Sequence, residues 1–157
     1  MDLRVTPFDA PDAVKLTEEV QQEYVVRYGG PDETAVDPAE FAPPRGLFLV
    51  GYLDGAPVAC GGWRTHEEPP PGLLPGDAEF KRMYVVKSLR GNGLARAVLA
   101  ELERTAAAAG HRRAVLETGQ KQPEAIALYR SSGYEEIPKF GYYRDDELSL
   151  CLGKALG

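Results

Sequence analysis

Cysteine and histidine are scarce in this sequence, and each scarcity removes a class of site. The two cysteines, Cys60 and Cys151, are too few for a disulfide framework, and both lie in apolar runs typical of strands. The two histidines, His66 and His111, are far apart in the sequence and form no cluster of metal ligands. We therefore expect both cysteines to be reduced and buried, and we expect no metal.

Long apolar runs and an excess of positive charge are also missing. No apolar stretch approaches the roughly 20 residues that span a bilayer. The N-terminus lacks the basic region followed by an apolar one that marks a secretory signal. The formal net charge of −6 argues against nonspecific nucleic-acid binding, which depends on Lys and Arg, and suits a cationic substrate. We expect a cytoplasmic protein that binds neither membranes nor nucleic acid.

Strand and helix patterns alternate along the chain, whose 157 residues suffice for one domain with a buried core. Apolar, β-rich runs predict strands at 2–8, 47–53, 57–64, 78–86, 113–118, 134–137 and 147–152. Apolar residues at three- and four-residue spacing predict helices at 11–28, 92–109 and 122–132. The order predicts a single domain over residues 1–157, a mixed sheet with helices on its faces.

Two local features refine this pattern. Asp54-Gly55 lies between two predicted strands and indicates a type I′ hairpin turn, which needs positive φ. Within the strand at 78–86, simple alternation places Glu79 and Met83 on one face and Phe80 on the other.

A glycine-rich loop joins the strand at 78–86 to the next helix and predicts an anion site. It has the sequence Arg90-Gly91-Asn92-Gly93-Leu94-Ala95. Glycines let the backbone approach an anion, and the first turn of a helix has N–H groups without intrahelical partners and a partial positive charge. Arg90 adds a permanent charge.

Several anion-binding interpretations of this loop compete. A P-loop would require Lys-Ser/Thr after the glycines, which the sequence lacks. A dinucleotide fingerprint would require a small residue at Arg96, although Glu117 follows at about the usual distance for a ribose contact. Taken alone, the loop leaves a dinucleotide site and a plain turn both open.

A second motif changes this balance. The segment QPEAIALYRSSGY at 122–134 has the form Asn-x-x-Ala-x-x-x-Tyr-x-x-x-Gly-Phe/Tyr, except that Gln122 replaces Asn and lengthens the arm of the amide. Together with Arg90–Ala95, which matches Arg/Gln-x-x-Gly-x-Gly/Ala, it resembles the GNAT N-acetyltransferase superfamily. The resemblance covers about residues 46–152.

The resemblance implies a fold and a co-substrate. The fold is a mixed, mostly antiparallel sheet of about six or seven strands, with helices on both faces and a V-shaped splay between the fourth and fifth strands. The co-substrate is acetyl-CoA, with pyrophosphate on the glycine loop and pantetheine along the strand before it. Lys81, Arg82 and Lys87 are either candidates for the 3′-phosphate or solvated charges. The implied cofactor-binding residues are Met83, Tyr84, Val85, Arg90, Gly91, Asn92, Gly93, Leu94, Ala95 and Gln122.

The resemblance also implies direct attack of an amine on the thioester in a ternary complex. A backbone N–H within Met83–Val85 would polarise the carbonyl. Glu79 resembles the family's usual base, and Glu117 is the alternative base or a contact for a cationic substrate. Tyr129 matches the usual general acid. Tyr142, in an aromatic turn, is a candidate substrate contact.

Three functions follow from these patterns. The first is an N-acetyltransferase for a primary amine of a small molecule or peptide, and it leaves monomer and homodimer both open. The second is a CoA-binding sensor or a degenerate member without chemistry. The third is a dinucleotide-dependent oxidoreductase. The acceptor is not identified, because the segments that determine it in this family are the least patterned here.

Overall fold

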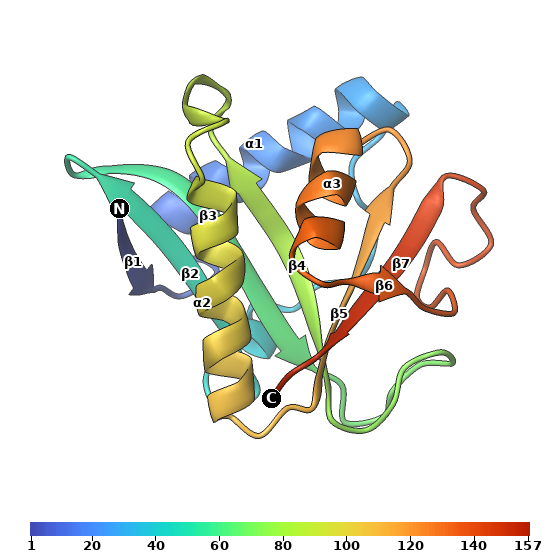
Figure 1. Cartoon of the computed structure of the whole chain (residues 1–157). Coiled ribbons are helices and arrows are strands. Elements are labelled where there is room, and N and C mark those ends of the chain that lie inside the picture. Colours follow the sequence, from blue (N-terminus) through green and yellow to red (C-terminus); the bar gives the residue numbers. More distant parts are fainter.

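Seven strands form one mixed sheet in the order β1-β2-β3-β4-β5-β7-β6 (Figure 1). The structure is a computed structural model that describes all 157 residues. The strands are β1 (Asp2–Val5), β2 (Gly46–Leu53), β3 (Ala56–Thr65), β4 (Asp77–Val85), β5 (Arg113–Gly119), β6 (Glu135–Glu136) and β7 (Ser149–Ala155). The helices are α1 (Pro11–Tyr28), α2 (Leu94–Ala108) and α3 (Pro123–Ser131), with 3₁₀ turns η1 (Pro38–Phe41) and η2 (Lys87–Leu89).

All neighbouring strands are antiparallel except β4 and β5. The predicted mixed, mostly antiparallel sheet is therefore confirmed. A dinucleotide fingerprint belongs to a mostly parallel, doubly wound sheet. This sheet has only one parallel pair, so it does not support the dinucleotide-binding interpretation. None of the helices combines the length and the apolar character needed to cross a bilayer.

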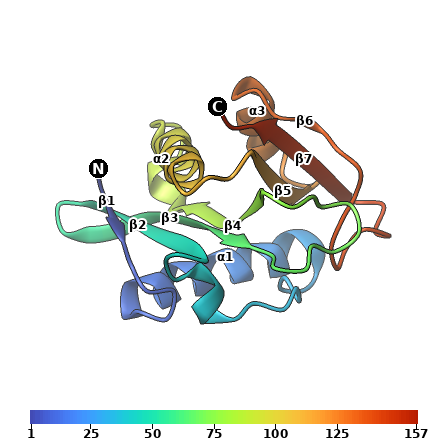
Figure 2. The ribbon, with the colours of Figure 1, turned by 90° about the horizontal axis from the view of Figure 1, so that it is seen from below.

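The helices cover both faces of the sheet, as expected. Figure 2 shows α2 and α3 on one face and α1 with η1 on the other. On the α2 face, Val98 and Leu102 pack with Trp63 and Phe80 in the larger core. On the α1 face, a smaller core contains Ala13, Leu16, Phe41, Phe48, Val50 and Cys60.

The strands β4 and β5 pair over only part of their length. Asp77–Phe80 pairs with Arg113–Leu116, and the parallel ladder then stops. β5 continues along β7 as far as Gly119, while β4 continues along β3 as far as Val85. The two strands thus diverge in the V that was predicted, and the β5-facing edge of β4 has no strand partner beyond Phe80.

A bulge in β4 makes the predicted side-chain alternation wrong. The register of β3 and β4 shifts between Cys60 and Gly62, and Arg82 on β4 has φ of 61°. The Cys60 thiol donates to the Arg82 carbonyl at 3.2 Å and holds the bulge. The extra residue brings Met83 to the same face as Phe80, in the larger core.

Glycine positions account for two element boundaries. Asp54 and Gly55 have φ of 50° and 80°, which confirms the type I′ turn between β2 and β3. Gly93 has φ of 78°, outside the helical region, so α2 begins at Leu94 rather than at Asn92 as predicted. Both cysteines are free and buried, as expected.

Candidate active site

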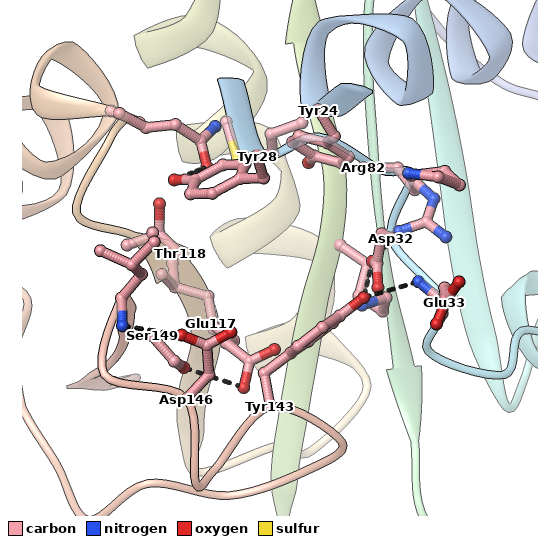
Figure 3. A pocket seen from close by; sticks show the side chains of 18 of the residues that line it. Tyr24, Tyr28, Asp32, Glu33, Arg82, Glu117, Thr118, Tyr143, Asp146 and Ser149 are labelled. Carbon is pink, nitrogen blue, oxygen red and sulfur yellow. Dashed lines mark hydrogen bonds and ion pairs between the residues drawn. The ribbon is translucent and has the colours of Figure 1, made fainter. Parts of the chain in front are cut away.

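A cavity of about 400 Å³ lies where β4 and β5 diverge. Its walls come from β4, β5, the C-terminal end of α1 and the loop after it, α3, and the turn that precedes β7. Figure 3 shows Glu117 on the β5 side and Arg82 with Asp32 on the opposite side, with Tyr143 extending between them. The splay of the sheet therefore creates a pocket that sequence-distant segments line together.

The glycine loop follows η2 and leads into the N-terminus of α2. Gly91 and Gly93 both have positive φ, and a Cβ at either would meet nothing within 4 Å, so conformation rather than crowding requires glycine. No side chain caps the N-terminus of α2, so its first N–H groups remain available to an anion. Arg90 is the first residue of the loop, and its Nη1 contacts Glu23 of α1 at 2.7 Å.

Tyr129 of α3 and Met83 of β4 meet at the cavity. Both line it, and the Tyr129 hydroxyl lies 3.8 Å from Met83 Sδ. Burial raises the pKa of Tyr129 to about 12, so the phenol keeps its proton at neutral pH. The structure therefore places the predicted acid against the β4 segment that was predicted to bind pantetheine.

Glu79 does not line the cavity. Its Oε1 accepts from Arg64 Nε at 2.9 Å and lies 2.7 Å from His66 Nε2. Burial opposes ionisation, but the bonds to His66 and Arg64 and the charge of Lys81 lower the pKa of Glu79 to about 2. The carboxylate predicted as the base is thus buried in an ion pair.

Glu117 does line the cavity. Its Oε2 accepts from Ser149 Oγ at 3.2 Å, and no cation pairs with it. Burial raises the pKa of Glu117 to about 7, against smaller opposing contributions from Lys81 and Ser149. A carboxylate with this pKa exchanges protons near neutral pH, as a general base requires.

The remaining predicted residues divide between the cavity and its surroundings. Gln122 lines the cavity and its Oε1 accepts from the Tyr28 hydroxyl at 3.3 Å. Tyr142 is 62% exposed and does not line it, whereas Tyr143 does and accepts from the Glu33 amide at 2.7 Å. Tyr84 points to the α1 face, where its hydroxyl donates to Glu19 at 3.2 Å.

The prediction that Lys81 and Arg82 contact a CoA phosphate does not fit their position. Lys81 Nζ lies 3.1 Å from Asp32 Oδ2, and Arg82 pairs with the same oxygen. Asp32 belongs to the loop after α1, on the face of the sheet opposite to α2. Because the two cations flank it, the pKa of Asp32 lies well below its usual range despite burial.

The family resemblance implies that the first helix helps to determine the acceptor, but sequence reasoning did not single out the two α1 tyrosines at this site. Tyr24 and Tyr28 both line the cavity, and they lie four residues apart on one face of the helix. Gly119 on β5 leaves room for Tyr28, since a Cβ there would lie 1.8 Å from the Tyr28 hydroxyl. The four-residue spacing of two tyrosines was a usable signal, but it also fits ordinary packing.

These features define a class of protein. A splayed mixed sheet, an uncapped helix after a glycine loop and a cavity that holds a tyrosine and a protonatable carboxylate are the parts of an acyl-transfer fold. Residues 14–134 match the model of the Acetyltransferase (GNAT) family. The chain belongs to this family of N-acetyltransferases.

Relatives and solved structures agree with this assignment. An IAA acetyltransferase of Azospirillum brasilense is 36% identical over 143 residues, which cover 91% of this chain and 90% of that protein. A Klebsiella pneumoniae structure, provisionally described as an acyl-CoA N-acyltransferase, superposes with TM-score 0.77 and 28% identity over 99% of this chain and 97% of the other. A phosphinothricin acetyltransferase of Sinorhizobium meliloti, solved with AcCoA, shares the fold with TM-score 0.70 and 23% identity, and covers 99% and 88%.

Proposed function

We propose that this protein is a single-domain, acetyl-CoA-dependent N-acetyltransferase that acetylates a primary amine by direct attack in a ternary complex. The observation that carries the proposal is the cavity between β4 and β5, which Glu117, Tyr129 and the bulged segment of β4 line together. Members of the family use acetyl-CoA, which supplies the activated acetyl group.

The chain's residues fit acetyl-CoA in two places. The N-terminus of α2 presents N–H groups without a side-chain cap behind two glycines, which suits a pyrophosphate. The β5-facing edge of β4 has no strand partner beyond Phe80, so backbone groups on it can pair with an extended pantetheine chain, apart from the Val85 carbonyl, which accepts from Arg90 Nε at 3.0 Å. Met83, Tyr84 and Val85 lie on this edge, and Gln122 lies across the V from it.

Glu117 is the proposed base. An ammonium group has no lone pair, so the acceptor must lose a proton before or during attack. That proton goes to solvent, and Glu117 accepts the second proton of the nitrogen, directly or through a water molecule, as the C–N bond forms. Glu79 is proposed instead to hold the loop before β2 in place, because Arg64, which it pairs with, also donates to the Ala35 carbonyl at 2.9 Å.

Tyr129 and the β4 backbone act on the leaving side. A β4 amide within Met83–Val85 donates to the carbonyl oxygen as negative charge develops there. Tyr129 gives its phenolic proton to the sulfur as the C–S bond breaks, and solvent restores the phenol. The proton that Glu117 gains returns to solvent, so the cycle leaves the side chains unchanged.

The experiment is thiol release from acetyl-CoA with a panel of amines, run beside acetyl-CoA binding by calorimetry. The proposal expects release with at least one amine class and formation of the N-acetyl product. Binding without release across the panel would overturn it in favour of a CoA-binding sensor. Stabilisation by NAD(H) but not by acetyl-CoA would overturn both.

A further inference from the structure

Two buried cations face the cavity and share one acceptor. Lys81 and Arg82 side chains are 7% and 5% exposed, and both lie among the residues that line it. Lys81 has three N–H donors and Arg82 has five, yet the protein offers each a single side-chain acceptor, the same Asp32 Oδ2. Most donors of this pair are therefore left without a protein partner.

The charge of this cluster is also uneven. Two cations against the ionised Asp32 leave one positive charge, and the other oxygen of Asp32 accepts from the Thr34 amide at 2.9 Å. Glu79 lies close enough for the charge of Lys81 to lower its pKa, but it forms no ion pair with either cation, because Arg64 and His66 hold its carboxylate. A buried charge is costly unless it is paired, so this wall of the cavity favours an anionic ligand group.

The backbone at Arg82 supports a functional role for its side chain. Arg82 has φ of 61°, in the left-handed region that is strained for a residue with a Cβ. A bulge of this kind changes the direction in which the side chain points. Here it brings the guanidinium to Asp32 beside the cavity (Figure 3).

The other acidic residues of the cavity form no ion pair with Lys81 or Arg82, although Figure 3 shows Glu33 beside Asp32. Glu33 and Asp146 line the cavity but are exposed, so water screens their charges. Glu117 lies on the other strand of the V from Arg82. The cavity thus offers cations on one wall and a base on the other.

We propose that the acceptor is an amine that carries a carboxylate within a few bonds of its nitrogen, and that Lys81 and Arg82 bind this carboxylate. This inference rests on the proposed function. Lys81, Arg82 and Met83 are consecutive, so the Cα atoms of both cations lie within about 7 Å of the Cα atom of Met83, where the acetyl group would lie. A small amino acid bound through its carboxylate on this wall then presents its amine towards Glu117 on the other strand of the V.

The test compares amino acids with their carboxamides as acceptors. Each carboxamide keeps the size and the amine but loses the negative charge. The amine of a carboxamide is less basic and thus more deprotonated near neutral pH, so intrinsic reactivity favours the carboxamide. We expect the opposite order, with kcat/KM for the best amino acid at least about 10-fold above that for its carboxamide, the range of one charge-assisted hydrogen bond.

Arg82→Gln should remove this preference, lowering kcat/KM for the amino acid by about 10- to 100-fold more than kcat/KM for the carboxamide. Arg113→Gln is the matched control. Arg113 Nη2 pairs with the buried carboxylate of Asp77 at 2.7 Å outside the cavity, so its loss likewise removes a cation from a buried acid. The control should lower stability without altering the preference.

The outcomes separate the two proposals. Efficient acetylation of carboxamides or simple amines, equal to that of the amino acids, would overturn the carboxylate site and leave the acetyltransferase intact. Weaker acetyl-CoA binding in Arg82→Gln, with the acid preference retained, would assign these cations to the CoA phosphates instead. No acetylation of any amine would overturn the proposed function, and this inference with it.

Discussion

Glu79 Oε1 accepts a hydrogen bond from Arg64 Nε at 2.9 Å, and the two residues lie directly opposite each other on β4 and β3. Both side chains are almost completely buried. Arg64 also reaches the Ala35 carbonyl and Glu40, so one ion pair connects two strands to the loop before β2. This ion pair explains why Glu79, at the position expected for the base, has a pKa lowered to about 2 instead of one near neutrality.

Glu79→Gln should therefore lower stability more than catalysis. Removal of one partner leaves Arg64 buried and only partly compensated by Glu40, and we expect a loss of about 3 kcal/mol in the free energy of unfolding. Glu79 has a folded-state pKa of about 2, below its ordinary value of 4.5, so its contribution is present above pH 4.5 and declines as the pH falls towards 2. Denaturant unfolding of wild type and variant at pH 7 measures the loss of stability, and the same comparison at pH 3 measures how much of the Glu79 contribution remains there. A variant of normal stability with turnover reduced 100-fold would return Glu79 to the role of base.

Glu117→Gln should have the converse effect. The amide has nearly the same shape but cannot accept a proton, so we expect turnover to fall by about 100-fold or more. Since the folded-state pKa is raised from 4.5 to about 7, the unfolded chain loses its proton first, and stability should fall as the pH rises from 4.5 to 7. The variant should lack this decline and be at least as stable as the wild type at pH 7. Unfolding curves beside turnover rates distinguish it from Glu79→Gln.

The pH dependence of kcat/KM gives a second view of the same residue. Glu117 must be deprotonated to act as a base, so kcat/KM should rise with pH, with an apparent pKa near 7, and then level off. Titration of the amine itself adds a separate dependence on pH. Glu117→Gln should remove the limb near 7 from its residual activity. A limb that persists unchanged in this variant would show that another group titrates.

The arrangement of strands and helices was predictable because each element has a local pattern. The helix at Pro11–Tyr28 and the hairpin at Asp54-Gly55 depend on periodicity, proline and positive φ within a few residues. The splay of β4 and β5 was predicted from family resemblance alone. No local pattern shows where two parallel strands stop pairing.

The identity of the base was not predictable in the same way. Whether Glu79 faces a cavity or Arg64 depends on the register of β3 and β4, which a proline-rich connection at residues 66–76 does not specify. The bulge at Arg82 is a further non-local feature, since the opposing residues Cys60 and Gly62 define it. Tyr142 and Tyr143 lie in an aperiodic turn, so alternation gave no reason to choose Tyr143.

Tyr129→Phe tests the leaving-group side of the reaction. The change removes the hydroxyl and keeps the ring, which packs against Tyr134 with centroids 5.7 Å apart. We expect turnover to fall by about 100-fold with the affinity for acetyl-CoA nearly unchanged, because only the transition state uses the proton. Single-turnover kinetics and calorimetry measure the two quantities. An unchanged rate would mean that water protonates the thiolate.

The glycine loop provides a comparison within one helix. Gly93 at the start of α2 and Gly110 after its end both have positive φ, and a Cβ at either meets nothing within 4 Å. Alanine at either position should therefore cost a similar amount of stability, about 1–2 kcal/mol, through backbone strain alone.

Only Gly93 lies where the pyrophosphate is expected. Relief of the strain in Gly93→Ala reorients the first N–H groups of α2, so we expect the Kd for acetyl-CoA to rise by about 10-fold or more, equivalent to one charge-assisted hydrogen bond. Gly110→Ala should leave that Kd unchanged at equal loss of stability. Calorimetric titration with acetyl-CoA and with dephospho-CoA shows which phosphate the substitution affects. The ratio of the two affinities should be the same in both variants, because neither glycine is expected to contact the 3′-phosphate that dephospho-CoA lacks. Equal weakening of acetyl-CoA binding by both substitutions would contradict a pyrophosphate site at this loop, since the effect would then follow from stability alone.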